Sequence, residues 1–219
     1  MNPLIITLAF MFLFSSARAF STKPALVHRI LVPIATGSEE IETTCITDVL
    51  TRFGADVTVA SVESDLTVKM SRGLKIQADC KINDLPYPSN EYSAIVLPGG
   101  VPGVNNLASC STLTSLLKSH RKEKGLIAAI CAAPSTVLSP LGLLEGGVCT
   151  GYPMKDFDDL IISSGGILQD GDVIYCERNN LITSKGPATG LMFGLTVGEY
   201  LFGEEKAKEV ASDLLMLEE

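Results

Sequence analysis

The feature that most constrains the fold is an alternation of strand, helix and strand that begins at Arg29. Residues 29–34 form an apolar run of strand length, and residues 56–62 form another. Between them, residues 39–53 predict a helix, with Ser38 as the N-cap and acidic side chains in the first turn. A β-α-β unit of this kind implies a parallel sheet with helices on both faces.

The rest of the chain continues this pattern. Further buried strands are predicted at 94–97 and 126–130, hairpins at 66–82 and 173–184, and helices at 104–124, 132–138 and 186–202, with a last helix after 204. One doubly wound α/β domain over residues 29–219 accounts for all of these elements. In such sheets the functional site lies beyond the carboxyl ends of the strands.

Composition excludes several classes of function. The 219 residues carry a formal net charge of -8, which argues against nucleic acid or an anionic membrane as the main partner. None of the six cysteines forms a C-x-x-C pair. The two histidines, His28 and His120, are expected on the surface. We therefore predict no metal site, no cofactor and no histidine-dependent catalytic triad.

The N-terminus resembles a targeting segment. An apolar run at 4–14 is too short to span a bilayer and is followed by Ala17-Arg18-Ala19, a small-residue cleavage pattern. We expect a signal peptide at 1–19, and a transit-like or linker segment at 20–28 that lacks acidic residues. The protein is expected to enter the secretory pathway, either for a plastid through a bipartite leader or for secretion. The mature protein is expected to have no membrane span.

Cys131 directly follows the apolar strand predicted at 126–130 and precedes a predicted helix. This order is typical of a nucleophile elbow, in which a sharp turn presents the reactive side chain near a helix N-terminus. Unpaired backbone N–H groups and the helix dipole favour a thiolate there. The alternative is a buried structural cysteine, which is common in cores.

The turn after Leu97 contains Pro98, Gly99 and Gly100. Glycines allow backbone N–H groups to approach a reacting oxygen closely. Together with the N–H of Ala132, these residues are candidates for an oxyanion hole. Many Pro-Gly-Gly segments are only turns.

Glu42 is the most informative polar residue. On a helical wheel it falls at the centre of the apolar half of the helix predicted at 39–53. That half is formed by Ile41, Cys45, Ile46, Val49, Leu50 and Phe53. Burial raises the pKa of a carboxyl group, so Glu42 is a candidate for holding or moving a proton at the edge where Cys131 lies. Alternatively, it only caps its own helix.

Four motifs in this order resemble the ThiJ/PfpI superfamily, and most closely its DJ-type branch of deglycases and glutathione-independent glyoxalases. The motifs are GSEEIE at 37–42, VLPGG at 96–100, AAICAAP at 128–134 and TSKGPAT at 183–189. The resemblance implies a flavodoxin-like sandwich and a homodimer. It implies that Cys131 is the nucleophile or oxidisable thiol and Glu42 its protonated partner, with Gly100 and Ala132 donating backbone N–H groups.

The same resemblance assigns other residues and an activity. Arg52, Arg72, Tyr152 and Pro187 are expected at the pocket or the dimer interface. Tyr152 occupies a place where several members of the family have histidine, which removes one candidate base. The implied substrates are methylglyoxal-type dicarbonyls and their adducts on proteins or nucleotides. Ala132 stands where protease-like members have histidine, so a peptidase is not expected. The alternative function is a non-enzymatic oxidative-stress sensor or redox chaperone that works through oxidation of Cys131.

Overall fold

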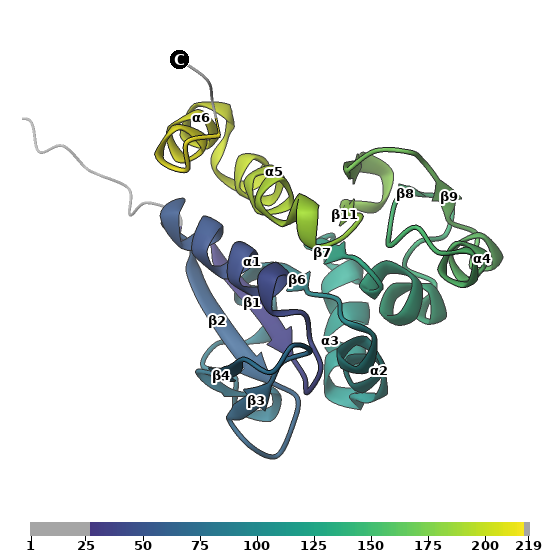
Figure 1. Cartoon of the computed structure of the whole chain (residues 1–219), viewed down its shortest axis with the longest axis horizontal. Helices are drawn as coiled ribbons and strands as arrows, with labels where there is room; N and C mark the ends of the chain where they lie inside the picture. The colour runs from purple at the N-terminus through teal and green to yellow at the C-terminus, as the bar shows by residue number, and fades with distance from the viewer. Residues whose placement is uncertain (1–26, 217–219) are drawn as a thin grey trace, which may run out of the picture.

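A computed structural model describes residues 27–216 (Figure 1). Within these residues, seven strands form one sheet in the order β10-β11-β7-β6-β1-β2-β5. The strands are β1 (Arg29–Ile34), β2 (Asp56–Ser61), β5 (Cys80–Lys81), β6 (Tyr92–Leu97), β7 (Leu126–Ile130), β10 (Val173–Cys176) and β11 (Leu181–Ser184). Neighbouring strands are parallel except for β10 and β11, which form the predicted hairpin. The mostly parallel sheet and its helices confirm the predicted flavodoxin-like fold.

The helices cover both faces of this sheet. α1 (Glu40–Arg52) links β1 to β2, whereas α2 (Val101–Ser109) and α3 (Ser111–Lys122) link β6 to β7 in the opposite direction across the sheet. Because such crossovers are right-handed, opposite directions place the helices on opposite faces. The strand order reverses between β1 and β6, and the loops that follow these strands diverge there to leave a crevice.

Two smaller sheets complete the domain. β3 (Thr67–Lys69) and β4 (Lys75–Gln77) form the hairpin predicted within 66–82. β8 (Val148–Cys149) and β9 (Ile167–Leu168) pair in parallel, and α4 (Lys155–Ser163) joins them. In Figure 1 this α4 unit lies at the opposite end of the molecule from α6 (Glu204–Asp213).

α1 packs closely against α5 (Gly190–Phe202), and the two helices lie side by side in Figure 1. Glycines on α5 permit this approach. A Cβ atom added at Gly194 would lie 2.9 Å from Val49 Cβ, and one added at Gly198 would lie 2.1 Å from Phe53 Cε2. The close contact keeps α1, and therefore Glu42, in a fixed position against the sheet.

Three expectations require correction. The helix predicted at 104–124 is two helices, because the chain adopts extended geometry at Cys110. The helix predicted at 132–138 is a short π-helical segment, Pro134–Leu138. His120 is buried rather than on the surface: its Nε2 lies 3.0 Å from the Leu126 carbonyl oxygen.

The predicted leader at 1–19 lies outside the described residues, as does most of the segment predicted at 20–28. Within residues 27–216, the structure contains no helix with the length and apolar character needed to cross a bilayer.

Candidate active site

Three loops meet at the carboxyl edge of the sheet. α1 follows β1 and carries Glu42, the Gly99-Gly100 turn follows β6, and Cys131 follows β7. Parallel strands deliver their carboxyl ends to one edge, which is why residues up to 89 positions apart in the chain come together. A Cβ atom added at Gly99 would lie 2.8 Å from Glu42 Oε2 and 3.0 Å from Cys131 Sγ. Gly99 therefore lies against both functional groups.

Cys131 occupies a sharp, strained turn. Its φ angle is 64°, in the left-handed region that side chains other than glycine rarely adopt. Two backbone hydrogen bonds hold this conformation: Cys131 N–H donates to the Ser184 carbonyl at 2.9 Å, and Tyr152 N–H donates to the Cys131 carbonyl at 2.8 Å. The residue is 8% exposed, at the floor of a pocket. Cys131 thus occupies the sharp turn after β7 that the sequence predicts, and its role as a nucleophile stays a prediction.

Glu42 points into the core, as its wheel position predicts, and is 0% exposed. Gly99 N–H donates to Glu42 Oε2 at 2.6 Å, and the buried Oε1 has no hydrogen-bond partner among residues 27–216. Burial is the largest cause that raises the pKa of Glu42, to about 7, while the Gly99 and Cys131 hydrogen bonds act against it. A carboxyl group with this pKa can exchange a proton near neutral pH.

The expected thiolate at Cys131 is not what the electrostatics favour. Burial first, and then the charge of Glu42, raise the pKa of the Cys131 thiol to about 12, although the N–H groups of Gly100 and Ala132 act to lower it. The reason is that Cys131 is buried beside an acid, and only a short π-helical segment follows it. The hydrogen bond from the thiol lowers the pKa of Glu42 and the charge of Glu42 raises the pKa of Cys131, so the two groups titrate as a coupled pair.

Helix α1 starts differently from the sequence prediction. The N-cap is Glu39, whose Oε2 accepts the N–H of Glu42 at 2.8 Å. Ser38 instead accepts the N–H of Ala35 through its side chain. Ile41 is 52% exposed, because the buried stripe of α1 is centred on Glu42 and Ile46. Glu39 also lines the pocket, a role the sequence analysis missed even though an acidic residue at a helix start is a capping signal.

A pocket of about 400 Å³ opens above Cys131. Among the predicted residues, it is lined by Arg72, Gly100, Ala132, Tyr152 and Pro187. Sequence reasoning did not identify its other lining residues, which are Glu39, Ser71, Val101, Pro102, Met154 and Phe157. No periodic pattern marked these positions, because they belong to loops and helix starts.

The part of the pocket lined by Ser71 and Arg72 is held in place by α1. Glu40 accepts the backbone N–H of Arg72 at 2.7 Å through Oε1 and the Ser71 hydroxyl at 2.7 Å through Oε2. The turn between β3 and β4 is therefore held over the pocket. Arg52 lies at the opposite end of α1, where it pairs with Asp48 at 2.8 Å, and it does not line the pocket. Its role at a dimer interface stays a prediction.

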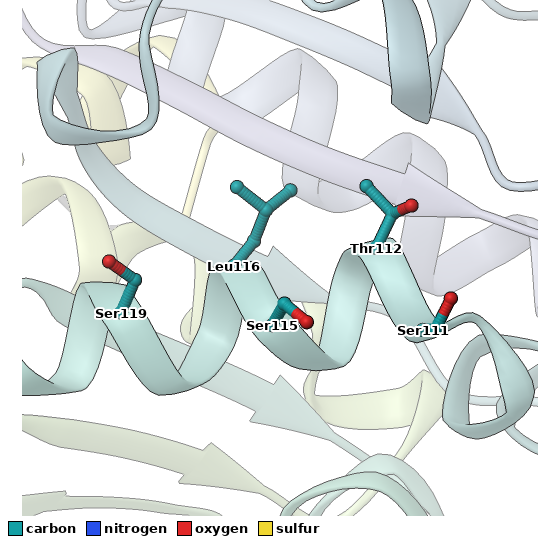
Figure 2. A pocket seen from close by; sticks show the side chains of 5 residues that line it. All are labelled: Ser111, Thr112, Ser115, Leu116 and Ser119. Carbon is teal, nitrogen blue, oxygen red and sulfur yellow. The ribbon is translucent and has the colours of Figure 1, made fainter.

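Another hollow, of about 480 Å³, runs along α3 and is shown in Figure 2. All five lining side chains come from this one helix, and none is titratable: Ser111, Thr112, Ser115, Leu116 and Ser119. Its lining holds no acid or base that could activate the hydroxyl groups as nucleophiles. In the part of the chain that the structure describes, no cluster of three histidine, cysteine or acidic side chains is arranged to hold a metal ion.

Comparison with known proteins identifies relatives of the whole domain. The profile of the DJ-1/PfpI family matches residues 28–199. Protein DJ-1 homolog A of Arabidopsis thaliana is 41% identical over 187 residues, which are 85% of this chain and 46% of that protein. This chain thus spans about half the length of that relative. Protein dj-1beta of Drosophila melanogaster is 40% identical, with 85% of this chain and 96% of the relative covered.

A third relative is named for an activity. The glutathione-independent glyoxalase DJR-1.2 of Caenorhabditis elegans is 36% identical, with 82% of this chain and 91% of that protein covered. Among solved structures, oxidized Toxoplasma gondii DJ-1 superimposes with a TM-score of 0.79 at 41% identity. That match covers 86% of this chain and 98% of the Toxoplasma chain.

Proposed function

Because this chain belongs to the DJ-1/PfpI family, we propose that it is a cysteine-dependent, glutathione-independent glyoxalase that detoxifies methylglyoxal-type dicarbonyls. The same chemistry would release early dicarbonyl adducts from proteins or nucleotides. The observation that carries the proposal is the contact between Cys131 and a buried Glu42 whose pKa is about 7. A C. elegans relative named as a glutathione-independent glyoxalase supports the reaction class.

The first step is addition to the aldehyde. Ionised Glu42 takes the thiol proton while Cys131 Sγ forms a bond to the aldehyde carbon. The carbonyl oxygen gains the electron pair and faces the N–H groups of Gly100 and Ala132, which lower the pKa of the sulfur and therefore point towards the site of reaction. Protonation of that oxygen by Glu42 gives a hemithioacetal.

The second step is an internal oxidation and reduction that needs no cofactor. Glu42 removes the proton from the former aldehyde carbon, and the neighbouring carbonyl oxygen takes up a proton, which gives an enediol. Glu42 then returns its proton to the neighbouring carbon, while the hydroxyl on the first carbon gives up its proton to replace the one taken up by the other oxygen. The first carbon becomes a thioester, and the second becomes an alcohol. Water then adds to the thioester and the C–S bond breaks, which releases lactate and restores the thiol. The sum is methylglyoxal plus water giving lactate.

The test is incubation of the protein with methylglyoxal in the absence of glutathione. We expect lactate from the wild type and none from Cys131→Ser. The Cys110→Ser variant is a matched control, because Cys110 is a partly exposed cysteine away from the pocket. No lactate from a folded wild-type protein would contradict the proposal.

A second candidate function is redox sensing through Cys131. A specific observation favours it: the Toxoplasma DJ-1 structure that this chain resembles is an oxidized form. Protonated Glu42 could donate a hydrogen bond to a sulfinate on Cys131, formed with a peroxide as the oxidant. Mass spectrometry of Cys131 after mild peroxide treatment separates the two functions. A sulfinate on Cys131 in a protein that does not turn over methylglyoxal supports redox sensing, whereas turnover without sulfinate supports the glyoxalase.

We also propose a homodimer and entry into the secretory pathway. The apolar side chains of Ile41 on α1 and Met192 on α5 are exposed although the two helices pack together, which supports a protein interface there. Sedimentation analysis tests the dimer, with Ile41→Glu expected to weaken it.

The leader is tested by the cellular location of a fluorescent fusion carrying residues 1–28, with plastid or secretion as the two supporting results.

A further inference from the structure

We infer that the wall formed by Tyr152, Met154 and Phe157 selects the substrate, so that the site prefers dicarbonyls with an aromatic or large apolar substituent over methylglyoxal. The inference rests on the proposed function and names its substrate class. It concerns a part of the pocket that the addition and proton-transfer steps do not use.

The three side chains give the pocket an apolar face that remains accessible. Tyr152 is 43% exposed and Met154 is 40% exposed, although both line the pocket above Cys131. The Tyr152 and Phe157 rings meet edge to face, with centroids 6.3 Å apart and an interplanar angle of 78°. An aromatic substituent placed here would cover apolar surface and find an aromatic partner.

The wall is anchored to the nucleophile itself. Tyr152 N–H donates to the carbonyl of Cys131 at 2.8 Å, and Met154 N–H donates to the carbonyl of Tyr152 at 2.8 Å. Phe157 N–H in turn donates to the Met154 carbonyl at 2.9 Å. Because these bonds form a continuous chain, the position of the wall relative to Sγ is set before substrate binds, which lowers the entropic cost of binding.

The space available also exceeds what a three-carbon substrate fills. The pocket volume is about 400 Å³, and the apolar side chains of Val101, Pro102 and Pro187 also line it. Gly186 leaves the Tyr152 ring unobstructed, since even an added Cβ would only touch Cδ2 at 3.6 Å. A substituent that leaves the reacting carbon at Cys131 therefore has room to lie along Tyr152.

The test compares phenylglyoxal with methylglyoxal as substrates without glutathione. We expect wild-type kcat/KM for phenylglyoxal to exceed that for methylglyoxal by about tenfold, the discrimination that an apolar pocket provides. In Tyr152→Ala, the ratio of the two kcat/KM values should fall close to one. Tyr175→Ala is the matched control, because Tyr175 is also 43% exposed and lies outside the pocket, and its ratio should equal that of the wild type. A wild-type preference for methylglyoxal, or a ratio unchanged in Tyr152→Ala, would overturn the inference.

Ligand binding separates this inference from the proposed function. Acetophenone and butanone are unreactive ketones that can be titrated against the protein and followed by NMR. If neither dicarbonyl is turned over, the proposed function fails, whereas tighter binding of acetophenone that is lost in Tyr152→Ala still supports the selective wall. Equal binding of the two ketones contradicts the wall whether or not turnover occurs.

Discussion

The carboxyl group of Glu42 and the thiol of Cys131 both lie against Gly99, and each shifts the pKa of the other. The charge of Glu42 raises the pKa of Cys131, while the hydrogen bond from the thiol lowers the pKa of Glu42. The pKa of each group therefore depends on the other, because removing the proton from one group changes the pKa of its neighbour. The pair is suited to a reaction in which a thiol loses its proton only when an electrophile arrives.

Replacing Glu42 by Gln should separate thiol reactivity from catalysis. Gln keeps the size and polarity of the side chain but removes the charge that raises the pKa of Cys131. Alkylation of Cys131 by iodoacetamide at pH 8, followed by peptide mass spectrometry, should become faster than in the wild type. Lactate formation should fall by about 100-fold or more, because no group remains to move the proton. Slower alkylation would show that the charge of Glu42 does not raise the pKa of the resting thiol.

The Gly99→Ala variant should lose both stability and activity. Its Cβ would lie 2.5 Å from Cys131 Cβ, so the strained turn at Cys131 must shift. Overpacking of this kind costs about 1–3 kcal/mol of unfolding free energy. Urea denaturation measures the loss, and Gly186→Ala is the comparison because its Cβ makes only an ordinary contact. Equal stability of the two variants would refute the tight packing at Gly99.

Gly198→Ala should weaken the packing of α5 on α1. The new methyl group would lie 2.1 Å from the ring of Phe53, and we expect a loss of about 1–3 kcal/mol. Combining Gly198→Ala with Phe53→Leu should recover part of the stability, because the smaller side chain frees the space. The coupling is measured by a double-mutant cycle in urea denaturation. Strictly additive effects would mean that the two residues do not collide.

Stability should depend on pH through Glu42. Its pKa is raised from 4.5 to about 7 on folding, so the neutral form is favoured in the folded state. This contribution is fully present below pH 4.5 and is lost as pH rises through 7, a change of about 3 kcal/mol. His120 acts in the opposite direction, since burial lowers its pKa from 6.5. The difference in unfolding free energy between wild type and Glu42→Gln isolates the Glu42 contribution, and it should vary across pH 4.5–8. A constant difference would place the pKa of Glu42 in its ordinary range.

The inward direction of Glu42 followed from the sequence because helical periodicity assigns each residue to a face. The meeting of its helix with the turns at Gly99 and Cys131 followed from the parallel order of strands, which brings their carboxyl ends to one edge. Both arguments depend on regular repeats along the chain and need no knowledge of distant contacts. They fail where the backbone is irregular, as at Cys110, where one predicted helix is divided in two.

What only the tertiary structure decided concerns contacts between segments that are distant in sequence. Burial of Cys131 and the nearby charge of Glu42 both oppose the thiolate expected there, and both depend on how three loops pack together. His120 was misplaced for a more local reason: its partner, the Leu126 carbonyl, is only six residues away, but the two meet only once the chain turns back from α3 into β7. A sequence pattern determines which side of an element a residue occupies, but desolvation depends on everything that packs against that side.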